Sequence, residues 1–409
     1  MAIEIRCATA GEMDQIGLMA AYVYGGSFGD GPDNITATSL NPDWTLCAFD
    51  GPKLVTSFGT FPFTMRANGN AIAFGGVTAV GTRPEYRRRG LVRRIMTQAI
   101  RDQRERGQSV AGLWASQAAI YQRYGYASIG ANRAYAVDTV DIRFFDDDGG
   151  HCSIERLSMP ECIEPARALY RQYIANRFGY LHRSSILWRE NVFDEDTPDG
   201  PVYLALASDA NGPQGYVAYT LRASKVPHRA RSQELKIRDL GWLTLDAYRS
   251  LWSFIAGHDL VGRVTWDNAP VDDPAPHVFA EPRMLHGRDD EGSWMRLIDV
   301  PEALRQRGYM PRERACVVKV RIAKDELADW NTGTWQIEVD ESGQPEVTSA
   351  EDDQDVISLT VRALASIYTG MHIARELAAA GIIEGSERAI RQADEIFATY
   401  FKPHCPDHY

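Results

Sequence analysis

The chain has 409 residues, which is too long for one compact core and predicts two or three domains. Its apolar fraction of 44% and charged fraction of 24% are typical of an ordinary soluble globular protein. The net charge of −11 disfavours nucleic acid and anionic membranes as partners. Because the sequence lacks a signal-peptide pattern at its start and any apolar run of about 18 residues, we expect a cytoplasmic protein.

The first 82 residues predict a strand, a helix and three further strands. Residues 3–9 predict the first strand, and apolar residues at helical spacing over 13–23 predict the helix. Residues 44–82 alternate or run apolar, with turn signals at 51–52 and 68–70, which predicts three antiparallel strands.

The next segment predicts a helix, a buried strand and a short helix or turn. The helix is expected over residues 90–106, because apolar residues again recur at helical spacing and Gly107 follows. The strand is expected over 109–116 and the short helix or turn over 117–126. The order for this first part of the chain is therefore β-α-β-β-β-α-β-α-β.

Five arginines fall within eight residues of the stretch PEYRRRGLVRR (84–94), where a predicted strand turns into the predicted helix. A helix N-terminus presents unpaired backbone N–H groups and a partial positive charge, which favours an anion. Gly90 lets the backbone approach closely, and guanidinium groups bind phosphate in bidentate fashion. The cluster therefore predicts a pyrophosphate site, with an ordinary solvated helix face as the alternative.

Two motifs in this region resemble those of the GNAT acetyltransferase superfamily. Residues 87–92 are similar to its Arg/Gln-x-x-Gly-x-Gly/Ala loop, although Val92 stands where the pattern has Gly or Ala. The segment IYQRYGY (120–126) resembles its Tyr-x-x-x-Gly-Phe/Tyr segment, which implies that Tyr121 is the general acid. From the residues alone, Tyr124 and Tyr126 are alternative proton donors.

The resemblance implies acetyl-CoA as the cosubstrate, with direct acetyl transfer through a tetrahedral intermediate. The strand that ends at Thr82 would pair with the pantetheine arm and stabilise the oxyanion, and the arginine loop would bind the pyrophosphate. The implied cofactor-binding residues are Val80, Gly81, Thr82, Arg87, Arg88, Arg89, Gly90, Leu91, Val92, Arg93, Ser116 and Gln117.

The remaining chain predicts two further domains. Residues 151–308 mix helices and strands but contain no second Arg-x-x-Gly-x-Gly motif. After residue 309 the sequence predicts strands, followed by helices over 356–370 and 386–401. We expect an α/β protein with mixed α+β sheets, and domains over residues 1–145, 146–308 and 309–409.

This three-part layout resembles the Eis (enhanced intracellular survival) family, through RRRGLVRRIM, WASQAAIYQRYGYA, SWMRLIDVPEALRQRGY and the aromatic-rich C-terminus. The resemblance implies tandem GNAT folds, the second of them degenerate, followed by a domain similar to sterol carrier proteins. It also implies N-acetylation of aminoglycosides or other small polyamines, including lysine-like amines, and a homohexamer built as a trimer of dimers. A lipid or sterol carrier with a vestigial acetyltransferase domain is the alternative hypothesis.

The last residues, FKPHCPDHY, contain four side chains that could ligate a metal: His404, Cys405, Asp407 and His408. We weigh a metal clip and a frayed end against a third possibility, implied by the Eis resemblance, that the terminal carboxylate of Tyr409 enters the active site as base or amine anchor. A carboxyl pKa of about 3.5 and an amine pKa of about 10 make direct deprotonation uphill by roughly 9 kcal/mol, which favours the anchor.

Two further expectations concern the acceptor and metals. The segment SFGD (27–30) follows the first helix, where this superfamily commonly binds its acceptor, so Phe28 and Asp30 are the candidate substrate-binding residues. The six cysteines lack Cys-x-x-Cys spacing, so we expect reduced thiols and no metal: Cys7, Cys47, Cys152, Cys162, Cys316 and Cys405.

Overall fold

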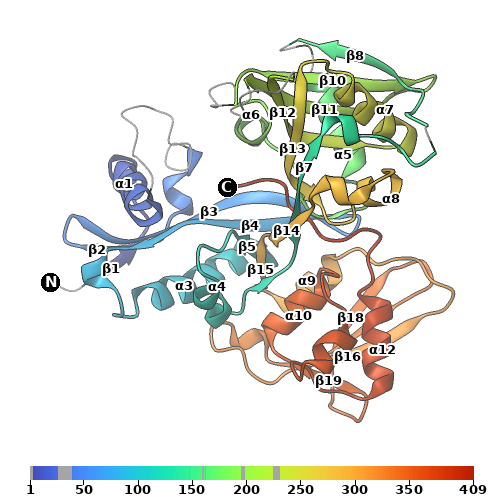
Figure 1. Ribbon diagram of the computed structural model, residues 1–409. Helices are drawn as coiled ribbons and strands as arrows, with labels where there is room; N and C mark the ends of the chain where they lie inside the picture. Colours follow the sequence, from blue (N-terminus) through green and yellow to red (C-terminus); the bar gives the residue numbers. More distant parts are fainter. Residues whose placement is uncertain are drawn as a thin grey trace. The chain divides into compact units, whose positions relative to one another are not determined.

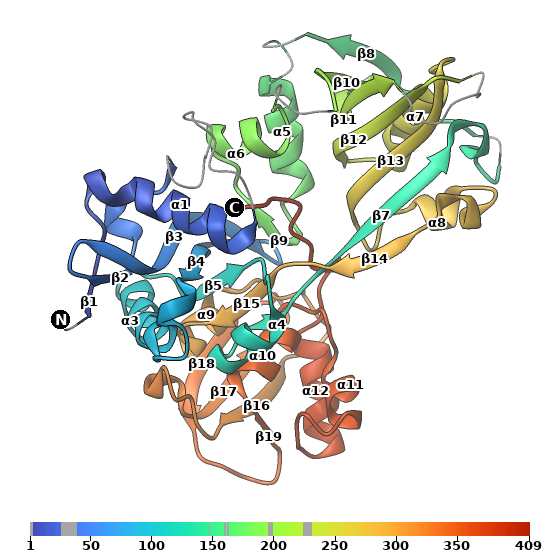
Figure 2. The same cartoon turned by 60° about the vertical axis from the view of Figure 1, so that its left-hand side comes forward.

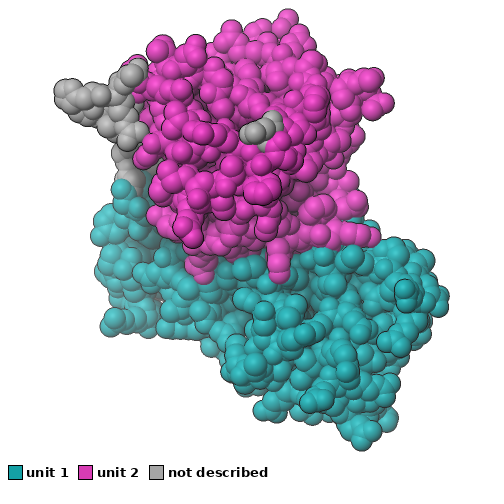
Figure 3. All heavy atoms as spheres, turned by 45° about the vertical axis from the view of Figure 1, so that its right-hand side comes forward, with its two compact units in different colours: residues 1–129, 293–399, 409 teal, residues 130–292, 400–408 magenta. Residues whose placement is uncertain are grey.

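The computed structural model describes the chain in seven stretches: residues 3–25, 39–146, 148–158, 161, 163–194, 199–223 and 231–409. These residues form two compact units, which Figure 3 colours separately. Unit 1 contains residues 1–129, 293–399 and 409, and unit 2 contains residues 130–292 and 400–408. The chain therefore enters unit 2 twice, and its last residue belongs to unit 1.

The first sheet of unit 1 has the strand order β1-β2-β3-β4-β5-β15-β6 (Figure 1). Strands β4 and β5 run parallel, and the other pairs are antiparallel. The bounds are β1 Glu4–Arg6, β2 Cys47–Asp50, β3 Lys53–Ala67, β4 Asn70–Thr82, β5 Val110–Leu113, β15 Trp294–Leu297 and β6 Ala127–Ser128. With the helices α1 (Met13–Tyr24), α3 (Leu91–Glu105) and α4 (Ala118–Tyr121), the predicted order of elements up to β6 is confirmed.

Helices α1 and α3 cover opposite faces of this sheet. Cys47 and Phe49 of β2 pack with α1, whereas Ala48 between them packs with the buried face of α3. Successive side chains of a strand point to opposite faces, so alternate residues of one strand serve two helices. This explains why the first three residues of β2, Cys47–Ala48–Phe49, are all apolar and buried rather than alternating.

The second sheet of unit 1 has the order β18-β17-β16-β19 (Figure 1). Its strands are β16 Cys316–Ile322, β17 Gly333–Val339, β18 Pro345–Ala350 and β19 Val356–Leu359. The associated helices are α9 Val300–Gln306, α10 Val361–Tyr368, α11 Ala374–Ala379 and α12 Glu387–Ile396.

The helix expected over 356–370 is wrong in its first part. Residues Val356–Leu359 form β19, which pairs in parallel with β16, and α10 starts only after Thr360. The Thr360 side chain accepts a hydrogen bond from the backbone N–H of Ala363, which caps the helix. The β-branched pair Val356–Ile357 favours a strand, so the capping threonine marks the true helix start.

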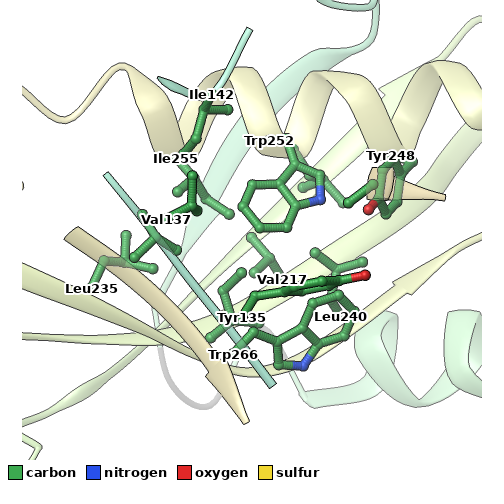
Figure 4. Close-up of a cluster of buried hydrophobic side chains, with 14 of the residues drawn as sticks. Tyr135, Val137, Ile142, Val217, Leu235, Leu240, Tyr248, Trp252, Ile255 and Trp266 are labelled. Carbon is green, nitrogen blue, oxygen red and sulfur yellow. The ribbon is translucent and has the colours of Figure 1, made fainter. Parts of the chain in front are cut away.

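Unit 2 contains a sheet with the order β14-β7-β13-β12-β11-β10-β8. The strands are β7 Ala131–Asp138, β8 Ser153–Leu157, β10 Val202–Asp209, β11 Gly212–Ala223, β12 Gln233–Trp242, β13 Val261–Pro270 and β14 Arg288–Glu291. Its other elements include α5 Ile163–Tyr173, β9 Phe178–Leu181, α6 Ser185–Asn191, α7 Leu245–Ala256 and α8 Ala275–Val278. Figure 4 shows its core, where Tyr248 and Trp252 of α7 pack with Val217, Leu235 and Trp266 of the sheet.

Two consecutive pairs of strands are divided between the units. Strand β7 directly follows β6 in the chain but pairs with β13 and β14 in unit 2. Strand β15 directly follows β14 but lies beside β5 in unit 1 (Figure 2), and it pairs with β6 on its other side. Residues 294–297 thus complete the sheet formed by the first 129 residues. No helix among the described stretches has the length and apolar character needed to span a membrane.

Candidate active site

The strands β4 and β5 separate at the centre of the first sheet. Their pairing covers only Phe74–Gly76, opposite Val110–Gly112. Strand β5 ends at Leu113, whereas β4 continues to Thr82. Beyond Gly76, the β5-side edge of β4 therefore has no paired strand among the described residues.

A bulge in β4 fixes the direction of backbone groups at this opening. The β3–β4 register shifts between Ser57 and Gly59, and Ala79 has a left-handed φ of 51°. The Ser57 hydroxyl donates to the carbonyl oxygen of Ala79 at 2.7 Å. Because a trans peptide holds its C=O and N–H on opposite sides, the N–H of Val80 points away from β3.

The side chain of Tyr24, at the end of α1, also reaches this bulge. Its hydroxyl donates to the carbonyl oxygen of Val80 at 2.9 Å. By the same geometry the N–H of Gly81 points away from that hydroxyl. The sequence analysis missed both Ser57 and Tyr24, since each acts from a strand or helix distant in the sequence and no motif marks them.

The arginine loop leads into the N-terminus of α3, as predicted. Arg88 and Gly90 have left-handed φ values of 62° and 75°, which turn the backbone sharply before the helix. The first bond of the helix runs from the N–H of Arg94 to the carbonyl of Gly90 at 3.1 Å. The N–H groups of residues 91–93 precede that bond and have no partner within the helix, an arrangement that favours an anion.

The guanidinium groups around this end are exposed and held mainly by backbone oxygens. Arg87 donates to Thr82 O at 3.2 Å, and Arg89 donates to Glu85 O at 2.8 Å. Arg93 forms an exposed ion pair with Glu326 at 2.6 Å. Val92, which departs from the GNAT pattern, is half-buried and packs against the core of unit 1, so its side chain is directed away from solvent.

Tyr121 lies at the end of α4 and is 4% exposed. Burial raises the pKa of its phenol above the ordinary value, with the nearby Tyr24 acting in the same direction and the Ser116 side chain opposing it. Its ring meets that of Tyr126 edge to face, with centroids 6.1 Å apart. Tyr121 thus faces two other groups of the opening, Ser116 and Tyr24, whereas Tyr126 lies deeper, 1% exposed and close to Arg296.

The remaining predicted cofactor residues lie around the same opening. Val80 and Thr82 are half-buried and Gly81 is buried at the end of β4, and the exposed Ser116 and Gln117 precede α4. The two candidate substrate residues, Phe28 and Asp30, lie outside the described residues.

Tyr409, the last residue, packs in unit 1 where β4 and β5 separate. Its ring lies 5.1 Å from that of Phe63 and 6.3 Å from that of Phe74, edge to face in both cases. A Cβ on Gly76 would approach the Tyr409 ring to 3.1 Å, so glycine leaves space for this ring. The end of the chain therefore lies at the opening of the sheet in unit 1.

Residues 400–408 bind to unit 2 along most of their length. The His404 N–H donates to Phe178 O at 3.0 Å, and its Nδ1 lies 2.9 Å from the Tyr180 hydroxyl. The carboxylate of Asp407 is fully buried and pairs with Arg183 at 2.7 Å. The alternative of a frayed end is therefore wrong.

Three of the four candidate metal ligands of the tail, His404, Cys405 and Asp407, have different partners. His404 contacts Tyr180 and Asp407 contacts Arg183, whereas the thiol of Cys405 donates to Asp407 O at 3.5 Å. Burial lowers the pKa of His404 to about 3 and raises that of Asp407 to about 6. Within the described part of the chain, no three His, Cys, Asp or Glu side chains form a group that could hold a metal.

Comparison with protein families defines the class of the enzyme. An acetyltransferase (GNAT) domain model matches residues 4–129, and a second acetyltransferase (GNAT) domain model matches residues 179–305. A sterol carrier protein domain model matches residues 300–406. The protein is thus a GNAT acetyltransferase, an acyltransferase whose fold implies the use of acetyl-CoA, with two GNAT domains followed by a sterol-carrier-like domain.

Full-length relatives narrow the class to a family. An uncharacterized N-acetyltransferase of Streptomyces avermitilis is 29% identical over 371 residues, covering 89% of each chain. N-acetyltransferase Eis of Mycobacterium tuberculosis is 27% identical over 332 residues, 79% of this chain and 78% of that one. The crystal structure of Eis1 from Mycobacterium abscessus matches with a TM-score of 0.81 and 25% identity over 100% of both chains. The chain belongs to the Eis-like family of GNAT N-acetyltransferases.

A further solved structure shares the fold. The GCN5-related N-acetyltransferase from Anabaena variabilis matches with a TM-score of 0.86 over 100% of both chains, at 24% identity.

Proposed function

We propose that this enzyme acetylates an amine of a small cationic molecule, such as an aminoglycoside or another polyamine or lysine-like amine. The observation that carries the proposal is the convergence, within unit 1, of the open edge of β4, the arginine loop and the buried phenol of Tyr121.

The residues around the opening fit acetyl-CoA. The N–H groups of Leu91, Val92 and Arg93, with the exposed guanidinium groups of Arg87 and neighbouring arginines, would hold its pyrophosphate. The end of β4, over residues 80–82, offers backbone groups to the pantetheine arm as an added strand would. Bound acetyl-CoA supplies the acetyl group as a thioester, and its sulfur must leave as a stabilised thiolate.

The N–H of Val80 would stabilise negative charge on the acyl oxygen during transfer. The bulge at Ala79 directs this N–H away from β3, and the Ser57 hydroxyl fixes the peptide plane. Such a preorganised donor contributes roughly 3–4 kcal/mol in other acyl-transfer enzymes.

Tyr121 would act on the departing sulfur. Because burial raises the pKa of Tyr121 further above that of a thiol, about 8.5, complete proton transfer to the thiolate is uphill. We therefore expect the hydroxyl to donate a strong hydrogen bond that stabilises the sulfur as a thiolate, which takes up a proton from solvent after it separates.

The carboxylate of Tyr409 would anchor the attacking amine or accept its proton after attack, when the nitrogen is far more acidic. The packing of the Tyr409 ring against Phe63 and Phe74 supports this, since it holds the chain end beside the opening of the sheet. Phe28 and Asp30 are proposed to contact the acceptor.

The test is an assay of thiol release from acetyl-CoA against a panel of aminoglycosides and aliphatic diamines. We expect turnover with at least one polyamine and none with a matched neutral polyol. Failure on every amine, together with no acetyl-CoA binding by calorimetry, would refute the proposal. We further propose, from the family resemblance, a cytoplasmic homohexamer built as a trimer of dimers, which sedimentation analysis would test.

A further inference from the structure

We propose that Arg296 is a positioning residue for Tyr121, and that through it the sterol-carrier-like part of the chain braces the acetyltransferase site. This inference rests on the proposed role of Tyr121. It assigns the C-terminal domain a function within the acetyltransferase itself, in place of lipid transport.

Arg296 lies on β15, the strand inserted between β5 and β6, and its side chain is 1% exposed. One of its terminal nitrogens, Nη1, donates to the carbonyl oxygen of Tyr124 at 2.5 Å. The other, Nη2, donates to Asp325 Oδ2 at 2.5 Å. A single buried guanidinium thus joins the turn that follows Tyr121 to a carboxylate of the C-terminal part of unit 1.

The carboxylate is itself fixed by neighbours in the sterol-carrier match. Asp325 Oδ2 accepts a second hydrogen bond from Asn331 Nδ2 at 3.0 Å, and Oδ1 accepts from the N–H of Leu327 at 3.3 Å. Asn331 is fully buried, and its Oδ1 accepts from the N–H of Val300 at 2.8 Å. Asp325 and Asn331 are thus buried and hydrogen-bonded to each other and to the backbone, which fixes the carboxylate in place.

The turn that carries Tyr121 closes around this guanidinium. Gly125 has a left-handed φ of 81°, and a Cβ there would lie 2.2 Å from Arg296 Nη1 and 2.8 Å from Val361 of α10. The N–H of Tyr126 donates to Tyr121 O at 3.2 Å. Two hydrogen bonds thus link Tyr121 to Arg296 through this turn: one from the N–H of Tyr126 to Tyr121 O, and one from Arg296 Nη1 to Tyr124 O.

Burying an arginine costs desolvation free energy, which a purely apolar contact would avoid. Its charge must leave water, and among the described residues Asp325 is the carboxylate that pairs with it. A well-packed apolar residue could hold β15 against α4 equally well. The specific gain from an arginine here is its planar donor group, which defines the direction of the Tyr124 carbonyl and hence of the turn.

The experiment compares Arg296→Met and Arg296→Lys with Tyr121→Phe in the full chain. General acid–base groups typically contribute roughly 10²–10⁴-fold, so a displaced Tyr121 should lower kcat with acetyl-CoA about ten-fold or more in Arg296→Met, with KM for acetyl-CoA changed less than about two-fold. An acetyl thioester of an aromatic thiol needs less help in leaving, so this substrate should restore a large part of the loss in both Tyr121→Phe and Arg296→Met. In the absence of substrate, the Gly125 and Tyr126 amides should exchange hydrogen faster in Arg296→Met.

Arg307→Met is the matched control, because Arg307 is equally buried in unit 1 but donates to the carbonyls of Tyr368 and Phe397, remote from the Tyr121 turn. Arg307→Met should destabilise the protein without changing the ratio of the two thioester rates. An equal change of that ratio in Arg307→Met overturns the inference, and so do unchanged ratios and unchanged amide exchange in both Arg296 variants.

Failure of the proposed function has a different signature, since Tyr121→Phe itself would then leave the ratio unchanged. Should Arg296→Met not fold, Arg296→Lys and Asp325→Asn carry the same comparison. Both retain a polar partner in the network, and no loss of turnover or of amide protection in either variant would also contradict the inference.

Discussion

At the scale of single residues, the proposed chemistry depends on the phenol of Tyr121. We expect Tyr121→Phe to lower kcat roughly 100-fold with little change in the dissociation constant of acetyl-CoA, because the hydroxyl acts only as sulfur departs. Tyr126→Phe is the matched control, since the Tyr126 phenol is buried deeper in the same ring pair. Stopped-flow turnover and calorimetry together separate the two quantities, and equal losses in both variants would transfer the role away from Tyr121.

The second prediction for a single residue concerns the terminal carboxylate of Tyr409 rather than its side chain. Adding two glycines converts its carboxylate to an amide while leaving the ring free to pack on Phe63 and Phe74. We expect the extended enzyme to lose most of its turnover and to keep its melting temperature and acetyl-CoA affinity. Normal acetylation by this extended chain would show that the terminal carboxylate takes no part in the reaction and that the tail is only structural.

At the scale of elements, the N-terminus of α3 is predicted to bind the pyrophosphate. Gly90→Ala forces a side chain into a left-handed conformation at about 1–2 kcal/mol, which the loop can relieve by moving its N–H groups. We expect the acetyl-CoA dissociation constant to rise about ten-fold. Gly107→Ala is the matched control at the other end of the same helix, because Gly107 has nearly the same φ, 74°, and equally open surroundings. Both variants should lose similar stability, and only Gly90→Ala should lose affinity.

The contribution of His404 to the docking of the C-terminal tail on unit 2 should weaken as the pH falls. Burial lowers the pKa of His404 to about 3, whereas its value in a released tail is about 6.5. Below pH 6.5 the released tail therefore binds a proton that the docked tail does not. The free energy of docking weakens by roughly 1.4 kcal/mol per pH unit as a result. Asp407, whose pKa is raised to about 6, acts in the opposite direction between about pH 6 and 4. The variant His404→Gln isolates the first effect. Between pH 6.5 and 5, its tail docking should lose roughly 2 kcal/mol less free energy than that of the wild type. Hydrogen exchange of the residue 404 amide measures this, once the pH dependence of the intrinsic exchange rate is corrected for.

At the scale of the whole molecule, the first 145 residues should not fold alone. Strand β15 comes from residues 294–297, and without it β6 loses its paired strand and β5 keeps only β4. The N–H of Ile129 donates to Ser293 O at 3.0 Å, so an Asn-Gly turn can join residue 129 directly to 293. We expect a chain of residues 1–129 and 293–399 joined in this way to melt cooperatively and to bind acetyl-CoA, and residues 1–145 alone to do neither. Cooperative folding of 1–145 would contradict this.

The sequence by itself determined the order of elements up to β6, the GNAT class, and the place of the arginine loop and of Tyr121 near one another in the chain. These features are local: helical spacing, turn residues and a glycine at a strand-to-helix junction depend on neighbours a few residues apart. Only the tertiary structure decided that β15 completes the first sheet, that Ser57 and Tyr24 bond to the bulge in β4, and that Arg296 joins the Tyr124 carbonyl to Asp325. It also decided the fate of the tail, where His404 and Asp407 are anchors in unit 2 and Tyr409 alone packs in unit 1. Such contacts join residues tens to hundreds of positions apart. Packing between them depends on shape and burial and leaves no periodic pattern along the chain, so they cannot be predicted from a local stretch of sequence.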